Sequence, residues 1–124
     1  MSPAQDFQTP IQHFVNAQST FQIPQIEESN AYLDDICGTD TRQSEGENLS
    51  CGFFRMMRSE SLTGKYPYNE TLIILHGTFE LVDGTGNKSS AKKGDVYFFP
   101  ENSMVTFSTS DEGMAFYAVQ RKRK

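Results

Sequence analysis

The chain has 124 residues, 16 of them Asp or Glu and 11 of them Lys or Arg, which gives a formal net charge of −5. This length suits a single domain with one hydrophobic core, and the acidic balance argues against general nucleic-acid binding, which needs a basic surface. No apolar run approaches the roughly 18 residues of a membrane-spanning helix. The start, MSPAQDFQTPIQ, lacks a secretion signal, so we expect a cytoplasmic protein.

The first 50 residues are predicted to form an N-terminal arm ahead of the main fold. Residues 1–24 are rich in Gln, Ser, Thr and Asn, and we expect a disordered start followed by one or two short strands, the later one ending at Pro24. In residues 25–36, QIEESNAYLDDI, apolar side chains recur near helical spacing, which predicts a short amphipathic helix. Residues 39–50 are almost entirely polar and are predicted to form an exposed loop.

Two cysteines, Cys37 and Cys51, flank this polar loop. A disulfide between them could close the loop. Because a cytoplasmic protein keeps its thiols reduced, we expect two free thiols and keep the disulfide as the less favoured alternative.

Short strands with turn signals between them fill residues 51–120. They are indicated by CGFFRMMRSE from Cys51, by YPYNETLIILHG from Tyr66 to Gly77, by a hairpin after Gly77, and by apolar runs at 96–99, 104–109 and 114–120. Strands repeating at intervals of about ten residues predict an antiparallel barrel or sandwich. The basic ending RKRK, residues 121–124, is predicted to be a frayed, solvated tail rather than a nucleic-acid or targeting segment.

The stretch from Tyr66 to Gly77 carries the strongest candidate chemistry. Successive side chains of a strand point to opposite faces. One face of this stretch is therefore predicted to carry Tyr66, Tyr68, Glu70, Leu72, Ile74 and His76. A lone carboxylate between two phenols and a run of aliphatic side chains is typical of a pocket wall rather than of a solvated surface.

The strand that begins at Cys51 is ambiguous because each of its faces carries one arginine. Phe53, Arg55 and Met57 alternate on one face, and Arg58 falls on the other. A strand buried on both faces would be apolar on both. We expect Arg55 to point into the cavity or onto a carboxylate, since Arg58 lies nearer the exposed end of the strand.

Two spacings resemble the paired motifs of a cupin barrel. Glu70 stands seven residues before Gly77, and Gly94-Asp95 opens a strand that ends at Pro100. The residues of these two motifs are most similar to those of the EutQ-like cupins of ethanolamine utilisation, including small stand-alone fungal relatives. The resemblance covers about residues 51–120, more than half of the chain.

This resemblance implies an all-β, single-domain cupin, a jelly-roll-like antiparallel barrel with an N-terminal arm and a short helix. Residues 1–50 are then the arm with its helix and polar loop, residues 51–120 the barrel, and residues 121–124 the basic tail. The resemblance also implies a homodimer, with the arm packed across the partner subunit.

The sequence departs from the cupin pattern at the metal ligands. Of the usual three histidines and one glutamate, only Glu70 is present, because the histidine positions fall near Gly64 and Tyr66 and on Val105. Transition metals prefer several nitrogen or sulfur donors. We therefore predict no metal and no other cofactor.

The leading functional hypothesis is a metal-independent cupin enzyme of the lyase or isomerase type, acting in secondary metabolism. It would move protons on a small carbonyl-containing metabolite by isomerisation, dehydration or cyclisation. The candidate catalytic residues are Glu70 as general acid or base, with Tyr66, Tyr68, Arg55 and His76. The candidate pocket residues are Phe53, Met57, Leu72, Ile74, Phe79, Phe99, Val105, Phe107 and Tyr117.

Two alternatives remain open. One is a divalent-metal enzyme in which Glu70 binds the ion with His76 or the tyrosines as unusual ligands. The other is a small-molecule-binding or assembly module without catalysis. The first predicts metal in the purified protein, and the second predicts that Glu70→Gln changes no activity.

Overall fold

Strand β4 (Glu70–Asp83) is the longest element of the computed structural model, which describes residues 7–26, 29–58 and 61–124. It pairs with β5, β6, β7 and β8, always antiparallel. The other elements of the described residues are α1 (Ala17–Thr20), β1 (Ala31–Gly38), the 3-10 turn η1 (Glu45–Glu47), β2 (Ser50–Met57), β3 (Leu62–Tyr66), β5 (Lys88–Lys92), β6 (Val96–Phe99), β7 (Ser103–Ser108) and β8 (Glu112–Val119).

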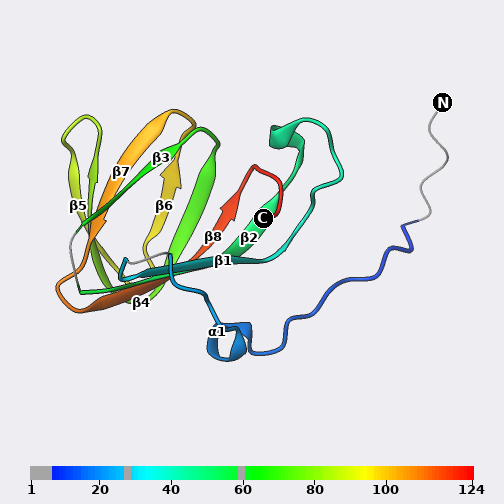
Figure 1. The fold of residues 1–124 in the computed structure, drawn as a ribbon, viewed down its shortest axis with the longest axis horizontal. Helices are drawn as coiled ribbons and strands as arrows, with labels where there is room; N and C mark the ends of the chain where they lie inside the picture. Colours follow the sequence, from blue (N-terminus) through cyan, green and yellow to red (C-terminus); the bar gives the residue numbers. More distant parts are fainter. Residues whose placement is uncertain (1–6, 27–28, 59–60) are drawn as a thin grey trace.

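The strands form one curled antiparallel sheet in the order β1-β2-β8-β4-β7-β3, with β5 and β6 attached to β4. The first part of β4 pairs with β6 and β8, and the second part pairs with β5 and β7. Figure 1 shows the sheet curling into an open barrel, with the arm leading away on the right. The all-β architecture agrees with the prediction, whereas the short helix lies at Ala17–Thr20 and not within residues 25–36.

The inside of the barrel is filled by aromatic and aliphatic side chains. Phe54, Phe79, Phe99 and Phe107 are each at most 5% exposed. Their ring centroids lie 5.2 to 5.9 Å apart, within the range of favourable aromatic pairs. These rings come from strands β2, β4, β6 and β7, so they hold the two parts of the sheet together.

A β-bulge in β4 resets which side chains point inward. Leu72 and Ile74 are buried before it, and Phe79 and Leu81 are buried after it, which shifts the alternation by one residue. The pairing with β8 shifts register between Ile74 and His76. Side chains between the two inward sets lie outside the barrel.

Gly77 makes the close packing at this bulge possible. Its φ is +72°, and a Cβ at this position would lie 2.2 Å from the Glu112 carbonyl oxygen. Only glycine combines this backbone conformation with such a close approach. The seven-residue spacing from Glu70 to Gly77 therefore corresponds to the part of β4 that runs from the cavity to the bulge.

Two predicted elements between residues 25 and 77 are wrong, and residues 27–28 of the first lie outside the described residues. Residues 31–36 belong to β1 and not to a helix, because this segment pairs with β2 along its length. The predicted strand from Tyr66 to Gly77 is broken: β3 ends at Tyr66, Pro67 follows in a bend, and β4 begins at Glu70. Proline has no N–H to donate to a sheet, which favours the break here.

The C-terminal part of the arm packs on the outside of the barrel. Residues 7–24 contain the short helix α1 and no strand, so the predicted short strands are wrong for this range, while residues 1–6 lie outside the described residues. Phe21 and Ile23 pack on a second apolar cluster of Ile36, Phe53 and Met114.

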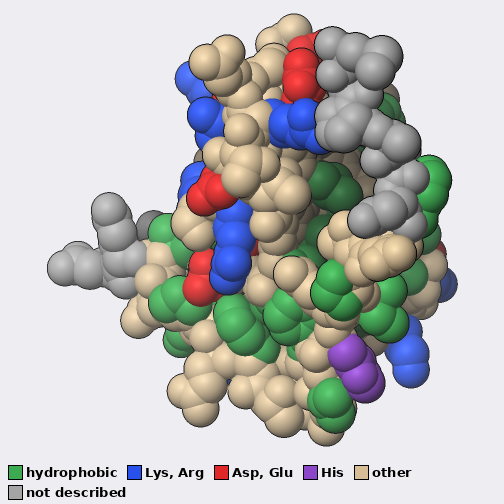
Figure 2. All heavy atoms as spheres, turned by 90° about the vertical axis from the view of Figure 1, so that its right-hand side faces the viewer, with side chains coloured by type: hydrophobic (Ala, Val, Ile, Leu, Met, Phe, Trp, Pro, Cys, Tyr) green, Lys and Arg blue, Asp and Glu red, His purple; other side chains and the backbone are tan. Residues whose placement is uncertain are grey.

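The first part of the described arm exposes apolar side chains. These are Phe7, Ile11, Phe14 and Val15. Figure 2 looks onto the side of the molecule where the arm lies and shows hydrophobic side chains gathered in the lower part of that face, with most charged side chains above them. Among the described helices, none is long and apolar enough to cross a membrane.

Candidate functional site

A cavity of about 620 Å³ opens between β3, the start of β4 and the C-terminal segment. Its lining combines aromatic and aliphatic side chains with charged groups. The lining residues are Ile26, Leu33, Glu45, Phe54, Leu62, Thr63, Gly64, Lys65, Tyr66, Pro67, Tyr68, Glu70, Leu72, Phe107, Tyr117, Val119, Arg121, Lys122, Arg123 and Lys124. A cavity of this size can enclose a small organic molecule.

Glu70 is the first residue of β4 and lines this cavity. Burial raises the pKa of its carboxyl group to about 7, against a lowering by the positive charge of Arg121, and the negative charge of Asp35 raises it further. Within the described residues, its side chain makes no hydrogen bond and no ion pair. The carboxyl group is thus open to a ligand and is close to half-ionised at neutral pH.

Tyr66 and Tyr68 line the same cavity as Glu70. Burial raises the pKa of Tyr66, and the negative charge of Glu70 raises it further, so this phenol keeps its proton. The Tyr66 ring packs on Phe99 with centroids 4.9 Å apart, which fixes its position. Neither tyrosine hydroxyl bonds to another residue within 7–26, 29–58 and 61–124, so both remain available as donors.

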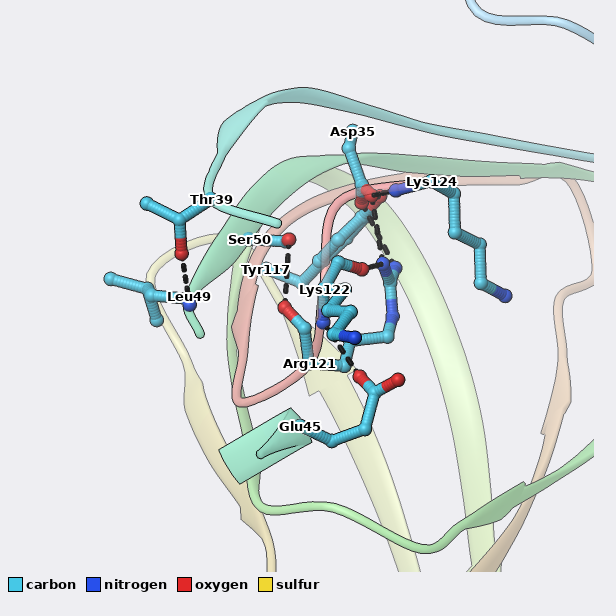
Figure 3. Close-up of polar contacts among 9 residues, drawn as sticks. All are labelled: Asp35, Thr39, Glu45, Leu49, Ser50, Tyr117, Arg121, Lys122 and Lys124. Atoms are coloured by element: carbon cyan, nitrogen blue, oxygen red, sulfur yellow. Dashed lines mark hydrogen bonds and ion pairs between the residues drawn. The ribbon is translucent and has the colours of Figure 1, made fainter. Parts of the chain in front are cut away.

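A buried polar network supports the wall of the cavity next to the C-terminal segment (Figure 3). The Tyr117 hydroxyl donates a 2.7 Å hydrogen bond to Asp35 Oδ1. The Arg121 guanidinium donates to both carboxylate oxygens of Asp35, at 2.7 and 2.9 Å. The Lys124 backbone N–H donates to Asp35 Oδ2 at 3.0 Å. Asp35 is 3% exposed and Arg121 is 8% exposed, so this is a buried, bidentate ion pair.

The network holds Asp35 and Tyr117 in opposite protonation states. Burial alone would raise the pKa of Asp35, but the hydrogen bonds from Arg121, Lys124 and Tyr117 outweigh it and lower that pKa below its usual value. Burial and the hydrogen bond to Asp35 raise the pKa of Tyr117. Asp35 is therefore a carboxylate and Tyr117 a neutral phenol at neutral pH.

The segment 121–124 is anchored to the barrel, so the prediction of a frayed tail is wrong. Besides the contacts of Arg121, the Lys122 N–H donates to Glu45 Oε2 at 2.8 Å and the Arg123 N–H donates to the Thr39 carbonyl at 2.9 Å. Basic side chains alone favour solvent, but the buried carboxylate of β1 gives this segment a fixed partner.

Arg55 and His76 lie outside the cavity. Of the two expectations for Arg55, the structure shows the second, because its side chain points onto the carboxylate of Glu112 and not into the cavity. Arg55 Nη2 is 3.6 Å from Glu112 Oε2, and its Cζ lies 5.7 Å from the Tyr32 ring centroid. His76 Nδ1 is 3.9 Å from Glu112 Oε1. Arg55 shares the outward-facing side of β2 with neighbours two residues away, whereas Phe54 points inward. His76 lies outside because of the bulge that precedes it.

The other residues predicted for the pocket divide into three groups. Leu72, Phe107 and Tyr117 line the cavity. Ile74, Phe79, Phe99 and Val105 belong to the core and are not among the lining residues. Phe53 lies in the second apolar cluster, under the arm. The Met57 sulfur accepts a 3.3 Å hydrogen bond from the Arg55 guanidinium. Of the nine residues predicted to line a pocket, only these three line the cavity, Leu72, Phe107 and Tyr117, because the cavity occupies one end of the barrel.

The cavity does not fit the metal site of a typical cupin. In the described part of the chain, no three His, Cys, Asp or Glu side chains come together as a metal site would require. A Cβ at Gly64 would lie 3.0 Å from the Tyr66 hydroxyl, so the phenol fills the space beside this glycine. His76 is six residues from Glu70, about 20 Å along an extended strand, and cannot join it at one ion.

Arg121, Asp35 and the segment that follows Arg121 were not among the residues predicted for the site. One signal was available in the sequence: Asp35 is a charged residue next to the apolar Ile36. Pairing of this acid with an arginine far along the chain could not be deduced from spacing.

The match to a family model covers residues 25–121 and is described as ethanolamine utilisation protein EutQ. A comparison with curated proteins finds no match.

Solved structures with the same fold include two EutQ proteins and a lyase. The EutQ of Salmonella typhimurium is 21% identical with a TM-score of 0.66, over 82% of this chain and 80% of that one. The Clostridium difficile EutQ is 25% identical with a TM-score of 0.60, over 73% and 68%. The DMSP lyase DddQ of Ruegeria pomeroyi is 22% identical with a TM-score of 0.54, over 58% and 38%.

The fold is a cupin fold, and the family match spans most of the chain, including β1, the barrel strands and Arg121. The chain belongs to the EutQ family.

Proposed function

We propose that this protein is an enzyme that transfers protons on a small carbonyl-containing metabolite, with Glu70 as the general acid and base. The observation that carries the proposal is the open, partly buried carboxyl group of Glu70 on the wall of the cavity, with a pKa of about 7. A group that is close to half-ionised at neutral pH can accept and return a proton efficiently. The lyase with the same fold is consistent with such chemistry.

The reaction begins with the Glu70 carboxylate taking a proton from the carbon next to the substrate carbonyl. The electron pair of that C–H bond moves into the carbon skeleton, and negative charge develops on the carbonyl oxygen. Tyr66 and Tyr68 donate hydrogen bonds to this oxygen, because their hydroxyls have no other partner in the described residues. When the deprotonated carbon carries a hydroxyl group, the hydroxyl proton moves to the former carbonyl oxygen and Glu70 returns its proton to the former carbonyl carbon, which gives an isomer. When the next carbon, on the side away from the carbonyl, carries a leaving group, departure of that group with its bonding electrons gives an eliminated product.

The apolar wall strengthens these interactions. Leu72 and Phe107 are 2% and 3% exposed and line the cavity beside Glu70. Where water is excluded, hydrogen bonds and charges act with greater strength than in bulk solvent. Tyr117 is not assigned as a donor to the substrate, because its proton is engaged by Asp35.

The test is hydrogen–deuterium exchange at carbon, followed by proton NMR in D₂O. Pyruvate, 2-oxobutyrate and dihydroxyacetone serve as probes of carbonyl chemistry. We expect the wild-type protein to accelerate exchange of at least one probe and Glu70→Gln to slow it about a hundredfold. The matched control is Glu80→Gln, since Glu80 is on the same strand but its carboxylate bonds to Ser90 outside the cavity.

Two outcomes would contradict the proposal. One is exchange of every probe at the rate of buffer alone. The other is equal rates for wild type and Glu70→Gln, which would instead support a binding module without catalysis. Stoichiometric metal bound at Glu70 together with Tyr66 or Tyr68 would support the divalent-metal alternative.

A further inference from the structure

The C-terminal wall of the cavity concentrates positive charge in a protein whose net charge is −5. Residues 121–124 are all Arg or Lys, and all four line the cavity. Arg121 is neutralised by its ion pair with Asp35. The side chains of Lys122, Arg123 and Lys124 make no hydrogen bond or ion pair with any residue that the structure describes. These three unpaired cations form the basic wall of the cavity.

The fold holds the basic wall in place through its backbone. The N–H groups of Lys122, Arg123 and Lys124 bond to Glu45, to the Thr39 carbonyl and to Asp35. Like charges fixed close together repel one another. A segment anchored at the backbone with its side-chain charges unpaired is therefore arranged to meet an opposite charge from outside the protein.

The acids of the cavity do not supply that charge. Among the lining residues, only Glu45 and Glu70 have carboxyl side chains. Glu45 accepts the backbone N–H of Lys122, and burial of Glu70 disfavours its charged form. An anionic ligand would balance the charge of the basic wall without competing with either group.

We propose that the cavity binds a small organic carboxylate, whose acidic group lies against Lys122, Arg123 and Lys124 while its apolar body lies between Phe107 and Leu72. This inference deepens the proposed function, on which it rests for the identification of this ligand as the substrate. The substrate class is then a metabolite that carries a carboxylate as well as the reacting carbonyl. Binding itself requires no catalysis and can be measured separately.

The experiment compares benzoate with benzamide, which have nearly the same shape but differ in charge. Isothermal titration calorimetry measures binding of both to wild type, to a triple variant with Lys122→Gln, Arg123→Gln and Lys124→Gln, and to a control triple variant with Lys88→Gln, Lys92→Gln and Lys93→Gln. The control removes the same charge from exposed positions at β5, away from the cavity. Glutamine keeps the backbone N–H groups that anchor segment 121–124.

We expect benzoate to bind wild type and the control triple variant with equal affinity. It should bind the triple variant of residues 122–124 at least about fivefold more weakly. Benzamide should bind all three proteins with similar, lower affinity. High salt should also reduce the difference in affinity between benzoate and benzamide, because ions in solution screen the interaction between exposed charges. Failure of benzoate to bind wild type, equal affinity for benzoate and benzamide, or equal losses in the two triple variants would each overturn the proposal.

This experiment separates the two proposals. Glu70→Gln reports on proton exchange, and the triple variant of residues 122–124 reports on benzoate binding, so each proposal has its own measurement. Charge-dependent binding without Glu70-dependent exchange would refute the enzyme and leave the anion site. Exchange that depends on Glu70, without charge-dependent binding of benzoate, would refute the anion site and leave the enzyme.

Discussion

Tyr117 of β8 donates a 2.7 Å hydrogen bond to Asp35 of β1. Strand β2 lies between β1 and β8 in the sheet, so the two side chains meet across β2. Gly52 of β2 makes the approach possible, because a Cβ there would lie 2.5 Å from the Tyr117 hydroxyl. The same carboxylate binds Arg121. One buried acid thus ties the edge strand, the last strand and the C-terminal segment beside the cavity.

Replacing Asp35 by Asn is expected to lower the free energy of unfolding by about 3 to 5 kcal/mol, because it leaves the buried Arg121 without its counter-charge. Urea unfolding at pH 7 measures this loss. Asp34→Asn is the matched control, since Asp34 is more exposed and its side chain makes no ion pair within the described chain.

The pH dependence gives a second check on Asp35. Its pKa is lowered in the folded state, so the stabilisation is complete above the ordinary Asp value of about 3.9 and is lost as pH falls through the folded pKa. The difference between wild type and Asp35→Asn should therefore shrink only in strong acid. A difference that already vanished at pH 6 would rule out this role.

Glu70 is expected to destabilise the folded protein at alkaline pH. Its pKa is raised to about 7, so between the unfolded value and pH 7 the folded state binds more protons and stability falls as pH rises. Glu70→Gln should match wild type near pH 4 and exceed it by about 3 kcal/mol at pH 8. Chemical unfolding at both pH values measures this. An equal offset at the two pH values would show that the carboxyl group is not buried as described.

Gly77→Ala is expected to lower the free energy of unfolding by more than about 2 kcal/mol, because the new Cβ meets the Glu112 carbonyl at a residue whose φ is +72°. Gly46→Ala serves as the control, since a Cβ there meets no atom within 4 Å and its φ is not in the left-handed region. Thermal unfolding of the two variants gives the comparison. Similar midpoints for both would mean that the bulge tolerates a side chain.

The sequence was sufficient for the barrel, and it placed Glu70 at the start of the strand that borders the cavity. Alternation marked Leu72 and Ile74 as inward-facing, and the spacing from Glu70 to Gly77 pointed to a cupin fold. The alternation failed beyond Ile74 because a bulge inserts one residue, and a pattern of period two cannot show where that happens. His76 was therefore placed on the wrong face.

The partners of charged groups were beyond what local patterns contain. Arg55 was expected in the cavity or on a carboxylate because Arg58 lies nearer the exposed end of the strand. The arm packs on the outer face of that strand, where Arg55 forms its ion pair with Glu112, a partner that the sequence pattern did not identify. Arg121 was assigned to solvent because its neighbours are basic. It is buried because Asp35 lies opposite it in the folded chain, and that contact depends on the order of strands rather than on nearby residues.

The role of Tyr66 can be separated from that of an ordinary aromatic residue by removing only its hydroxyl. Tyr66→Phe keeps the ring that packs on Phe99 and is expected to slow Glu70-dependent deuterium exchange about tenfold to a hundredfold, because a donor to the developing oxyanion is lost. Tyr97→Phe is the control, since the Tyr97 hydroxyl bonds to Ser89 and does not line the cavity.

The same pair of variants tests whether the phenol acts in the reaction or in binding. A hydroxyl that stabilises charge in the transition state affects the turnover rate, whereas one that only positions the bound probe affects KM. We expect the turnover rate of Tyr66→Phe to fall with KM nearly unchanged. Equal exchange rates for Tyr66→Phe and Tyr97→Phe would assign the hydroxyl no part in catalysis and leave Tyr68 as the remaining donor beside Glu70.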